Sequence, residues 1–266
     1  MLLTSVIVVL REVLESALLI SVLVALSGTL GIPRRWVVWA LGLGLAGAVG
    51  FSLGFNTVSD WFDGVGMEVV NAFMQGIIYL LLVALALLVL WDSLNTHAGG
   101  PLVQIIMALV VALSVAREGV EVLIYMYAYS DSLPQFIHAL TGAVIGTSIG
   151  ISIGVLLYYL LSHPVIGKSP TTGLVLLALI AAGLLSQAVL LLIQADWLPS
   201  HLPLWNTTDW LSESTVTGQL LYVLIGYEAT PTAIQVSFYF GGLIVLLTIA
   251  VLTAVSRSRS IRRFAG

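Results

Sequence analysis

Charged residues are scarce in this sequence. Of its 266 residues, only 8% are Asp, Glu, Lys or Arg, whereas a soluble domain usually has about 25%. Hydrophobic residues make up 59% of the chain, and its mean hydropathy is +1.10. This composition excludes a soluble domain of useful size and predicts an integral membrane protein.

Cysteine is absent, which excludes disulfide bonds, thiolate metal sites and cysteine nucleophiles. Basic residues are also missing from positions 1–10, and Arg11 and Glu12 interrupt the first apolar run. A cleaved signal peptide would need a basic start and an uninterrupted apolar stretch. We therefore expect residues 1–28 to be retained as a helix.

Seven segments are long and apolar enough to cross the hydrocarbon core, which takes about 20 helical residues. They are residues 2–28, 36–56, 68–92, 102–129, 138–162, 172–195 and 232–256. A further apolar stretch, VTGQLLYVLIGY at 216–227, is too short to span, and we expect it to be re-entrant or interfacial. The predicted fold is an all-α integral membrane protein with seven transmembrane helices.

The basic residues predict how the chain is oriented in the membrane. Apart from Arg11 and Arg117, all of them fall on one side of a seven-helix arrangement: Arg34, Arg35, Lys168, Arg257, Arg259, Arg262 and Arg263. The opposite side carries acidic residues instead: Asp60, Asp63, Asp131, Asp196, Asp209 and Glu213. Because cytoplasmic loops are enriched in Lys and Arg, we expect the N-terminus outside and the C-terminus in the cytoplasm.

The sequence contains an internal repeat. The motif Arg11-Glu12-x-x-Glu15 in the first predicted helix returns as Arg117-Glu118-x-x-Glu121 in the fourth. Small residues recur every fourth position in the second and fifth helices, at Gly42, Ala46, Gly50 and Gly54 and at Gly142, Gly146, Gly150 and Gly154. Such stripes are typical of close helix packing.

We therefore expect a single permease domain over residues 1–266, built from two repeats. The repeats would cover residues 1–95 and 100–196, followed by an outer loop with the seventh helix at 197–256 and a basic cytoplasmic tail at 257–266. Three helices are an odd number, so the second repeat should be inverted in the membrane. Inverted repeats are common in transporters, with the substrate site near the midplane at their interface.

The two motifs are candidates for a cation site. Residues three and four apart share a helix face, so each motif presents one arginine and two glutamates together. A charge at the bilayer centre costs roughly 2.5–3.5 kcal/mol, so these groups must pair, face the bundle interior or meet water. A salt-bridge network is the structural alternative, but it needs only one glutamate per arginine. Carboxylates without cysteine or a central histidine favour a hard cation or a proton.

A polar stripe on the third predicted helix is a candidate pathway. Glu68, Asn71 and Gln75 lie three and four positions apart, which places them on one face. They would serve either as a transfer path or as interhelical hydrogen-bonding groups. Gln187 and Gln194 in the sixth helix are similar, and we expect them to serve packing.

Three further residues have two interpretations each. Tyr125 and Tyr129 extend the face of the second motif and either line the pathway or belong to an outer aromatic belt. Glu228 is either a gate residue or a charge at the start of the last helix.

The paired motifs resemble the iron permease family of fungal plasma membranes and bacterial inner membranes. REVLE at 11–15 fits the family pattern, whereas REGVE at 117–121 has Val120 where the family usually has leucine. LLSQAVLLLIQADWLP at 184–199 and STVTGQLLYVLIGYEATP at 214–231 also resemble the family. The resemblance covers nearly the whole chain.

The resemblance implies a membrane permease for iron, in its ferric form, rather than an enzyme. Its candidate ligands are Glu12, Glu15, Glu118 and Glu121, supported by Arg11 and Arg117. Iron would be a transported substrate, with no permanently bound cofactor and no nucleic-acid partner. Family members often work beside an extracytoplasmic iron-binding or iron-oxidising protein, which would be a separate chain here.

Three alternatives stay open at this point. Some relatives are associated with other metals, including lead, so the substrate could be another divalent metal. A proton-coupled carrier for an organic solute would also use intramembrane carboxylates. A membrane-embedded di-iron oxidoreductase is the third alternative, although such sites usually include Glu-x-x-His, and no such pair occurs in this sequence.

Overall fold

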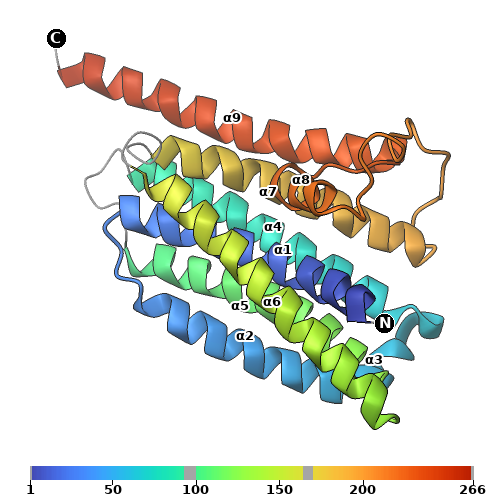
Figure 1. Ribbon diagram of the computed structural model, residues 1–266. Helices are drawn as coiled ribbons and strands as arrows, with labels where there is room; N and C mark the ends of the chain where they lie inside the picture. The colour runs from blue at the N-terminus through green and yellow to red at the C-terminus, as the bar shows by residue number, and fades with distance from the viewer. Residues whose placement is uncertain (1, 93–99, 164–169, 265–266) are drawn as a thin grey trace.

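The computed structural model describes residues 2–92, 100–163 and 170–264, which form a bundle of helices (Figure 1). The elements in chain order are α1 (Leu2–Thr29), α2 (Arg35–Leu53), α3 (Phe55–Ser59), a 3₁₀ helix (Trp61–Gly64), α4 (Gly66–Asp92), α5 (Pro101–Tyr127), α6 (Leu133–Ser162), α7 (Pro170–Gln194), α8 (Val216–Ile225) and α9 (Ala233–Phe264). The expected all-α class is confirmed for these residues.

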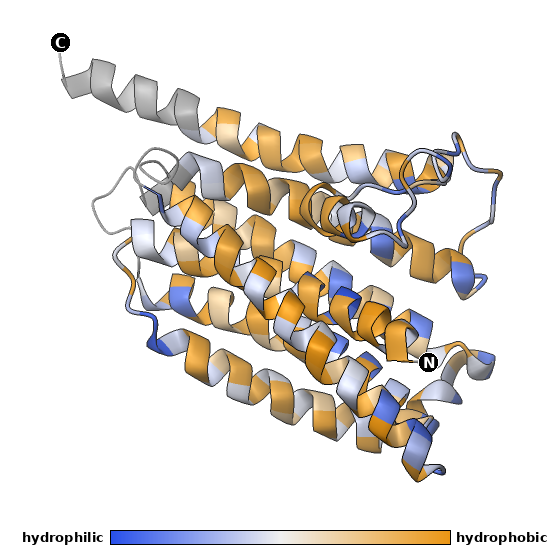
Figure 2. Ribbon diagram, in the orientation of Figure 1, coloured by the Kyte–Doolittle hydropathy of each residue, from blue (hydrophilic) through white to orange (hydrophobic). Residues whose placement is uncertain are grey.

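Six of the described helices are long and apolar enough to cross a membrane, namely α2, α4, α5, α6, α7 and α9. α1 is not among the six, although it has 28 residues. Figure 2 shows that hydrophobic residues dominate the long helices, while hydrophilic ones gather toward the ends of the bundle and at a few positions inside it. The protein is therefore a multi-pass membrane protein.

The helix ends depart from the predictions where local turn chemistry decides them. α6 begins at Leu133 instead of 138, because Pro134 is well suited to the first helical turn. α2 ends at Leu53 instead of 56, and the chain then turns through the positive-φ residues Phe62, Asp63 and Gly64. α9 continues through the predicted basic tail as far as Phe264.

The short apolar segment before the last helix forms α8, whose 10 residues are too few to span a membrane, as expected. The hydroxyl of Thr215 caps the first turn by accepting a hydrogen bond from the Gly218 amide at 3.1 Å. Gly226 ends the helix in the left-handed conformation, with φ of 66°. α8 packs against α7 and α1, so it is held beside the bundle.

The long helices pair across the two predicted repeats rather than within them. α1 packs most extensively against α6, α2 against α5, and α4 against α7. α9 packs on α7 and α4 and so lies at one edge of the bundle, whereas α2 lies at the opposite edge (Figure 1). The described N-terminus and α3 lie at one end of the bundle, and the 30–34 turn lies at the other.

Glycines allow these helix pairs to approach closely. A Cβ atom on Gly146 of α6 would meet the carbonyl oxygen of Val6 at 2.7 Å. A Cβ atom on Gly44 of α2 would meet the carbonyl oxygen of Ala112 at 2.9 Å. All four predicted glycines of α6 are buried in this way, so the prediction of a close-packing face is confirmed for α6.

The predicted stripe on α2 is wrong. Gly42, Ala46 and Gly50 are exposed, and a Cβ atom on Gly42 or Gly50 would meet nothing within 4 Å. The buried small residues of α2 are Ala40, Gly44 and Ala48. Successive residues are turned by about 100° around a helix, so a stripe displaced by two positions faces nearly the opposite direction.

An apolar core fills the half of the bundle away from the described N-terminus. It joins the second half of α1 to α4, α5 and α7 through side chains that include Val22, Leu23, Leu82, Leu85 and Met107, each at most 2% exposed. The charged motifs lie in the other half of the bundle. The core therefore closes one side of the region that the motifs occupy.

Some of the residues behind the predicted charge asymmetry lie at opposite ends of the bundle. Arg34 lies in the 30–34 turn, and its guanidinium is 5.1 Å from the centre of the Tyr158 ring. Asp60, Asp63 and Asp131 are exposed at the other end. Lys168 lies outside the described residues, as do the side chains of the tail arginines.

Candidate metal site

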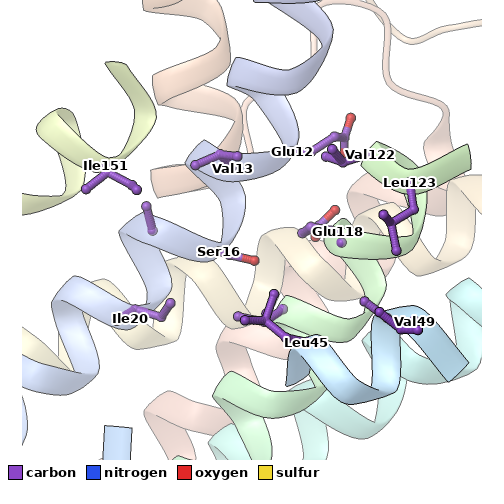
Figure 3. Close-up of a pocket in the computed structure, with 14 residues that line it drawn as sticks. Glu12, Val13, Ser16, Ile20, Leu45, Val49, Glu118, Val122, Leu123 and Ile151 are labelled. Atoms are coloured by element: carbon purple, nitrogen blue, oxygen red, sulfur yellow. The ribbon is translucent and has the colours of Figure 1, made fainter. Parts of the chain in front are cut away.

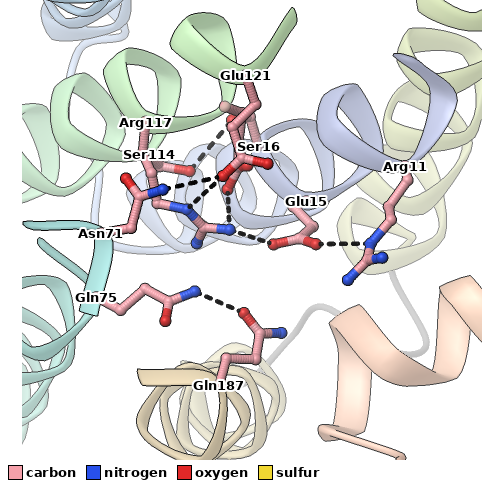
Figure 4. Close-up of polar contacts among 10 residues, drawn as sticks. Arg11, Glu15, Ser16, Asn71, Gln75, Ser114, Arg117, Glu121 and Gln187 are labelled. Atoms are coloured by element: carbon pink, nitrogen blue, oxygen red, sulfur yellow. Dashed lines mark hydrogen bonds and ion pairs between the residues drawn. The ribbon is translucent and has the colours of Figure 1, made fainter. Parts of the chain in front are cut away.

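The two Arg-Glu-x-x-Glu motifs meet where α1 and α5 cross (Figure 4). The two helices run antiparallel, because Ser5 hydrogen-bonds Tyr125 at 2.8 Å and Ser16 hydrogen-bonds Ser114 at 3.2 Å. This register brings the middle of the first motif against the second. The fold thus joins residues that are about a hundred positions apart in the sequence.

Three carboxylates converge at this crossing. Glu12, Glu118 and Glu121 each offer an oxygen, and these oxygens lie within 4.8 Å of one another. Glu12 and Glu118 are buried, whereas the side chain of Glu121 is 36% exposed. Oxygen ligands from two helices at this separation are suited to a hard metal cation.

Glu15, the fourth candidate ligand, lies outside that group and contacts both arginines. Its Oε1 is 3.7 Å from Nε of Arg11, and its Oε2 is 3.2 Å from a terminal nitrogen of Arg117. The two glutamates of the first motif therefore have different surroundings. Glu12 faces the other carboxylates, and Glu15 links the two arginines.

Arg117 is the buried centre of the ion-pair network. Its terminal nitrogen is 3.1 Å from Glu118 and 3.2 Å from Glu15, and its Nε is 3.9 Å from Glu121. Only 7% of its side chain is exposed. The planar guanidinium has five N–H donors, so one arginine can hold carboxylates from both motifs.

Arg11 has a more open position. Its side chain is 47% exposed, and Glu15 is its one ion-pair partner among the described residues. Its guanidinium lies 5.1 Å from the centre of the Tyr222 ring on α8, within the range of a cation–π interaction. Tyr222 was not singled out from the sequence, where nothing connects it to the first motif.

The cluster has more carboxyl groups than guanidinium groups, since four glutamates lie together with two arginines. In addition, Oε2 of Glu12 and Oε2 of Glu118 are buried without a hydrogen-bond partner. A buried carboxylate oxygen in that condition is costly. A cation bound beside these oxygens would remove that cost.

Two cavities adjoin the carboxylates. The smaller has a volume of about 150 Å³ and is lined largely by polar side chains: Arg11, Glu12, Glu15, Gln75, Arg117, Glu121, Gln187, Leu190, Leu191, Gln194 and Tyr222. The larger has a volume of about 410 Å³ between α1, α2, α5 and α6, and its other lining residues are mostly apolar (Figure 3). Glu118 borders the larger cavity, Glu121 borders the smaller, and Glu12 borders both.

The polar stripe of α4 reaches this site through two of its three members. Nδ2 of Asn71 donates a hydrogen bond to Oε1 of Glu121 at 3.3 Å, and Nε2 of Gln75 donates to Oε1 of Gln187 at 2.8 Å. Glu68 is half-buried near the start of α4, outside the carboxylate group. Gln187 and Gln194, expected to serve packing, both line the polar cavity.

The candidate pathway tyrosines lie at the C-terminal end of α5 and just beyond it. Tyr125 bonds Ser5 of α1, and its ring is in edge contact with Tyr129 at a centroid distance of 5.2 Å. Tyr127 is 79% exposed and points away. The pair therefore follows one helix face, as its spacing predicted.

Glu228 lies between α8 and α9, apart from the carboxylate group. Both of its carboxylate oxygens accept hydrogen bonds from Nε2 of the fully buried Gln235, at 2.7 and 2.6 Å. Burial raises the pKa of the Glu228 carboxyl above its ordinary value. Its backbone oxygen also accepts a hydrogen bond from the Trp205 indole, so Glu228 organises the loop beside α8.

Neither a curated protein nor a solved structure matches the chain. One family model does, over residues 2–263, and its description is the iron permease FTR1 family. The match includes both motifs and all the helices that line the polar cavity. On this evidence, the chain belongs to the iron permease FTR1 family.

Proposed function

We propose that the protein takes up iron, in the ferric state, through a site formed by the carboxylates of both motifs. Family membership supports an iron permease. The observation that carries the finer proposal is the approach of Glu12, Glu118 and Glu121 to within 4.8 Å at a helix crossing inside the bundle. Fe³⁺ is a hard cation, and oxygen donors suit it.

Glu15 completes the proposed ligand set when a cation is bound. It lines the polar cavity together with Glu12 and Glu121, and it contacts the same terminal nitrogen of Arg117 as Glu118. Arg11 and Arg117 would support the site by orienting the glutamates and by reducing their mutual repulsion. This division of roles is supported by the excess of carboxylates over guanidinium groups.

We further propose that α1 is a seventh span and that two inverted repeats form the permease. α1 packs against α5, α6 and α7. The exchange of partners, α1 with α6 and α5 with α2, is what two repeats related by a two-fold axis would give. The glycine contacts agree, because Val6 and Ala112 each stand five positions before the arginine of their motif (11 − 6 and 117 − 112).

The orientation remains the one predicted from charge, with the N-terminus outside and the C-terminus in the cytoplasm. The location of Arg34 at one end and of exposed aspartates at the other supports it. A cation would then arrive from the acidic, extracytoplasmic end. A separate iron-binding or iron-oxidising protein at that face would be the expected supplier.

The deciding experiment is ⁵⁵Fe uptake into proteoliposomes that contain the purified protein. Glu118→Gln keeps the shape of the side chain and removes one ligand charge, so uptake should fall to background. Asp131→Asn removes an exposed loop carboxylate and should transport normally. Wild-type uptake by a correctly inserted Glu118→Gln protein would reject the proposed site. Competition by unlabelled Fe³⁺, Fe²⁺, Mn²⁺ and Pb²⁺ would test the metal and its oxidation state.

A further inference from the structure

Two glutamines face each other beside the carboxylate cluster. Gln75 of α4 is 1% exposed and Gln187 of α7 is 6% exposed, and both line the polar cavity that Glu12 and Glu121 also line. Their one hydrogen bond uses the amide nitrogen of Gln75 and the carbonyl oxygen of Gln187. The carbonyl oxygen of Gln75 is left buried and without a partner.

Asn71, one turn earlier on α4, has the same arrangement. Its amide nitrogen donates to Glu121, and its carbonyl oxygen is buried without a partner. In both residues the hydrogen bond uses the amide nitrogen, so the carbonyl oxygen points away from the hydrogen-bond partner. Two glutamines that served only to join α4 to α7 could each donate to and accept from the other. The carbonyl oxygen of Gln75 is therefore available to a ligand.

The two glutamines come from corresponding helices of the two proposed repeats, as Glu12 and Glu118 do. Glu12 and Glu118 occupy equivalent positions in the first helices of the two repeats and meet at the α1–α5 crossing. Gln75 and Gln187 lie in the third helices of the same repeats and meet between α4 and α7. Both pairs border the region between the repeats, where a transporter binds its substrate.

We propose that the carbonyl oxygen of Gln75 is a neutral ligand to the transported cation in the polar cavity, and that Gln187 is the residue that positions it. This inference rests on the proposed function. Amide oxygens are hard donors that accompany carboxylates in protein cation sites. A neutral donor completes the coordination shell without adding charge, so it improves selectivity while limiting how tightly the ion is held.

The first test is the concentration dependence of ⁵⁵Fe uptake by Gln75→Leu in proteoliposomes. Loss of the oxygen should raise KM by about 10–100-fold, the range typical when a group supporting a metal site is removed, with a smaller change in kcat. Gln75→Asn keeps the amide but withdraws its oxygen, and a smaller rise in KM is expected. If Gln75→Leu yields little folded protein, Gln75→Asn takes its place in this test. Gln187→Leu should raise KM less than Gln75→Leu.

The second test has a readout that a purely structural role would not change. Gln75→His replaces an oxygen donor with an imidazole nitrogen, which suits Zn²⁺ and Ni²⁺ better than Fe³⁺. Zn²⁺ and Ni²⁺ should therefore compete with ⁵⁵Fe more strongly in Gln75→His than in the wild type. An unchanged order of competing metals, together with a wild-type KM in Gln75→Leu, would overturn the proposal.

Gln219 provides a matched control. It is 5% exposed on α8 and also has a buried carbonyl oxygen without a partner, but it does not line the polar cavity. Gln219→Leu should keep the wild-type KM, and an equal rise in KM in Gln219→Leu and Gln75→Leu would also overturn the proposal.

Glu118→Gln, measured in the same proteoliposome assay, separates a failure of the Gln75 inference from a failure of the proposed function. If it abolishes uptake while the Gln75 variants behave as wild type, only the inference about Gln75 fails. If it transports normally, the proposed function fails.

Discussion

Arg11 and Arg117 occupy the same position in two copies of one motif, yet their surroundings differ. Arg117 is buried and contacts carboxylates of both motifs, whereas Arg11 is half-exposed and lies against Tyr222. α8, which provides Tyr222, follows both proposed repeats in the chain and has no counterpart within them. A repeated sequence need not give a repeated environment when an added element contacts only one copy.

The two copies therefore contribute differently to stability. Arg117 neutralises carboxylates that have little contact with water, so its loss would leave buried charges uncompensated. Arg11 is solvated and can exchange its contacts without exposing a buried charge. We therefore expect substitutions of Arg11 in the first copy of the motif to be tolerated better than substitutions of Arg117.

The largest predicted effect separates the two arginines. Arg117→Gln should lower the free energy of unfolding by about 3–5 kcal/mol, because removing one partner of a buried ion-pair network leaves unpaired charge. Arg11→Gln should lower it by at most about 1 kcal/mol, as is typical of exposed ion pairs. Chemical unfolding of the detergent-solubilised proteins, followed by tryptophan fluorescence, measures both.

A compensating variant checks the cause of that effect. Adding Glu15→Gln to Arg117→Gln removes one of the stranded charges and should restore part of the lost stability. Equal losses for the two single arginine variants would show that the difference in burial has no energetic consequence.

The next prediction compares α2 with α6, the second helices of the two proposed repeats. Gly146→Ala would place a Cβ atom 2.7 Å from a backbone carbonyl of α1, and overpacking of this kind costs about 1–3 kcal/mol. Gly50→Ala has open space around it, so the better helix propensity of alanine should make it neutral or slightly stabilising. The same unfolding measurement applies, and destabilisation of both variants to the same degree would contradict the packing described for α2.

The smallest predicted effect concerns the contact that distinguishes Arg11. A double-mutant cycle of Arg11→Gln and Tyr222→Leu should give a coupling energy of roughly 0.5–1 kcal/mol, as expected for a cation–π pair with partial exposure. Gln219→Leu in place of Tyr222→Leu is the control, since Gln219 lies on the same helix. A coupling no larger than that of the control would mean that α8 does not hold Arg11.

The sequence predicted the long helices well because each needs only a continuous apolar stretch, which is a local property. It also predicted that the two motifs would approach each other, because both carry charges that cannot face lipid. The buried face of α2 was predicted wrongly. Small residues occur on several sides of that helix, and the spacing of Gly42 and Gly50 does not say which side meets α5.

Other features of the site depend on contacts between distant segments. The separation of Glu15 from the three converging carboxylates follows from the antiparallel register of α1 and α5. The pairing of Gln75 with Gln187 follows from the crossing of α4 and α7. A pattern within one helix identifies residues that share a face, but it does not identify the neighbour that the face meets.

The apolar core beside the carboxylates has an electrical consequence. Side chains such as Leu23, Leu82 and Leu85 are fully or almost fully buried there, and the membrane voltage falls mainly across regions that exclude water. The polar cavity lies on the other side of this layer, so in the proposed orientation an ion that reaches it from outside has crossed little of the field. We expect binding to depend weakly on voltage. Movement through the core would then draw most of the roughly 2.3 kcal/mol per charge that 100 mV supplies.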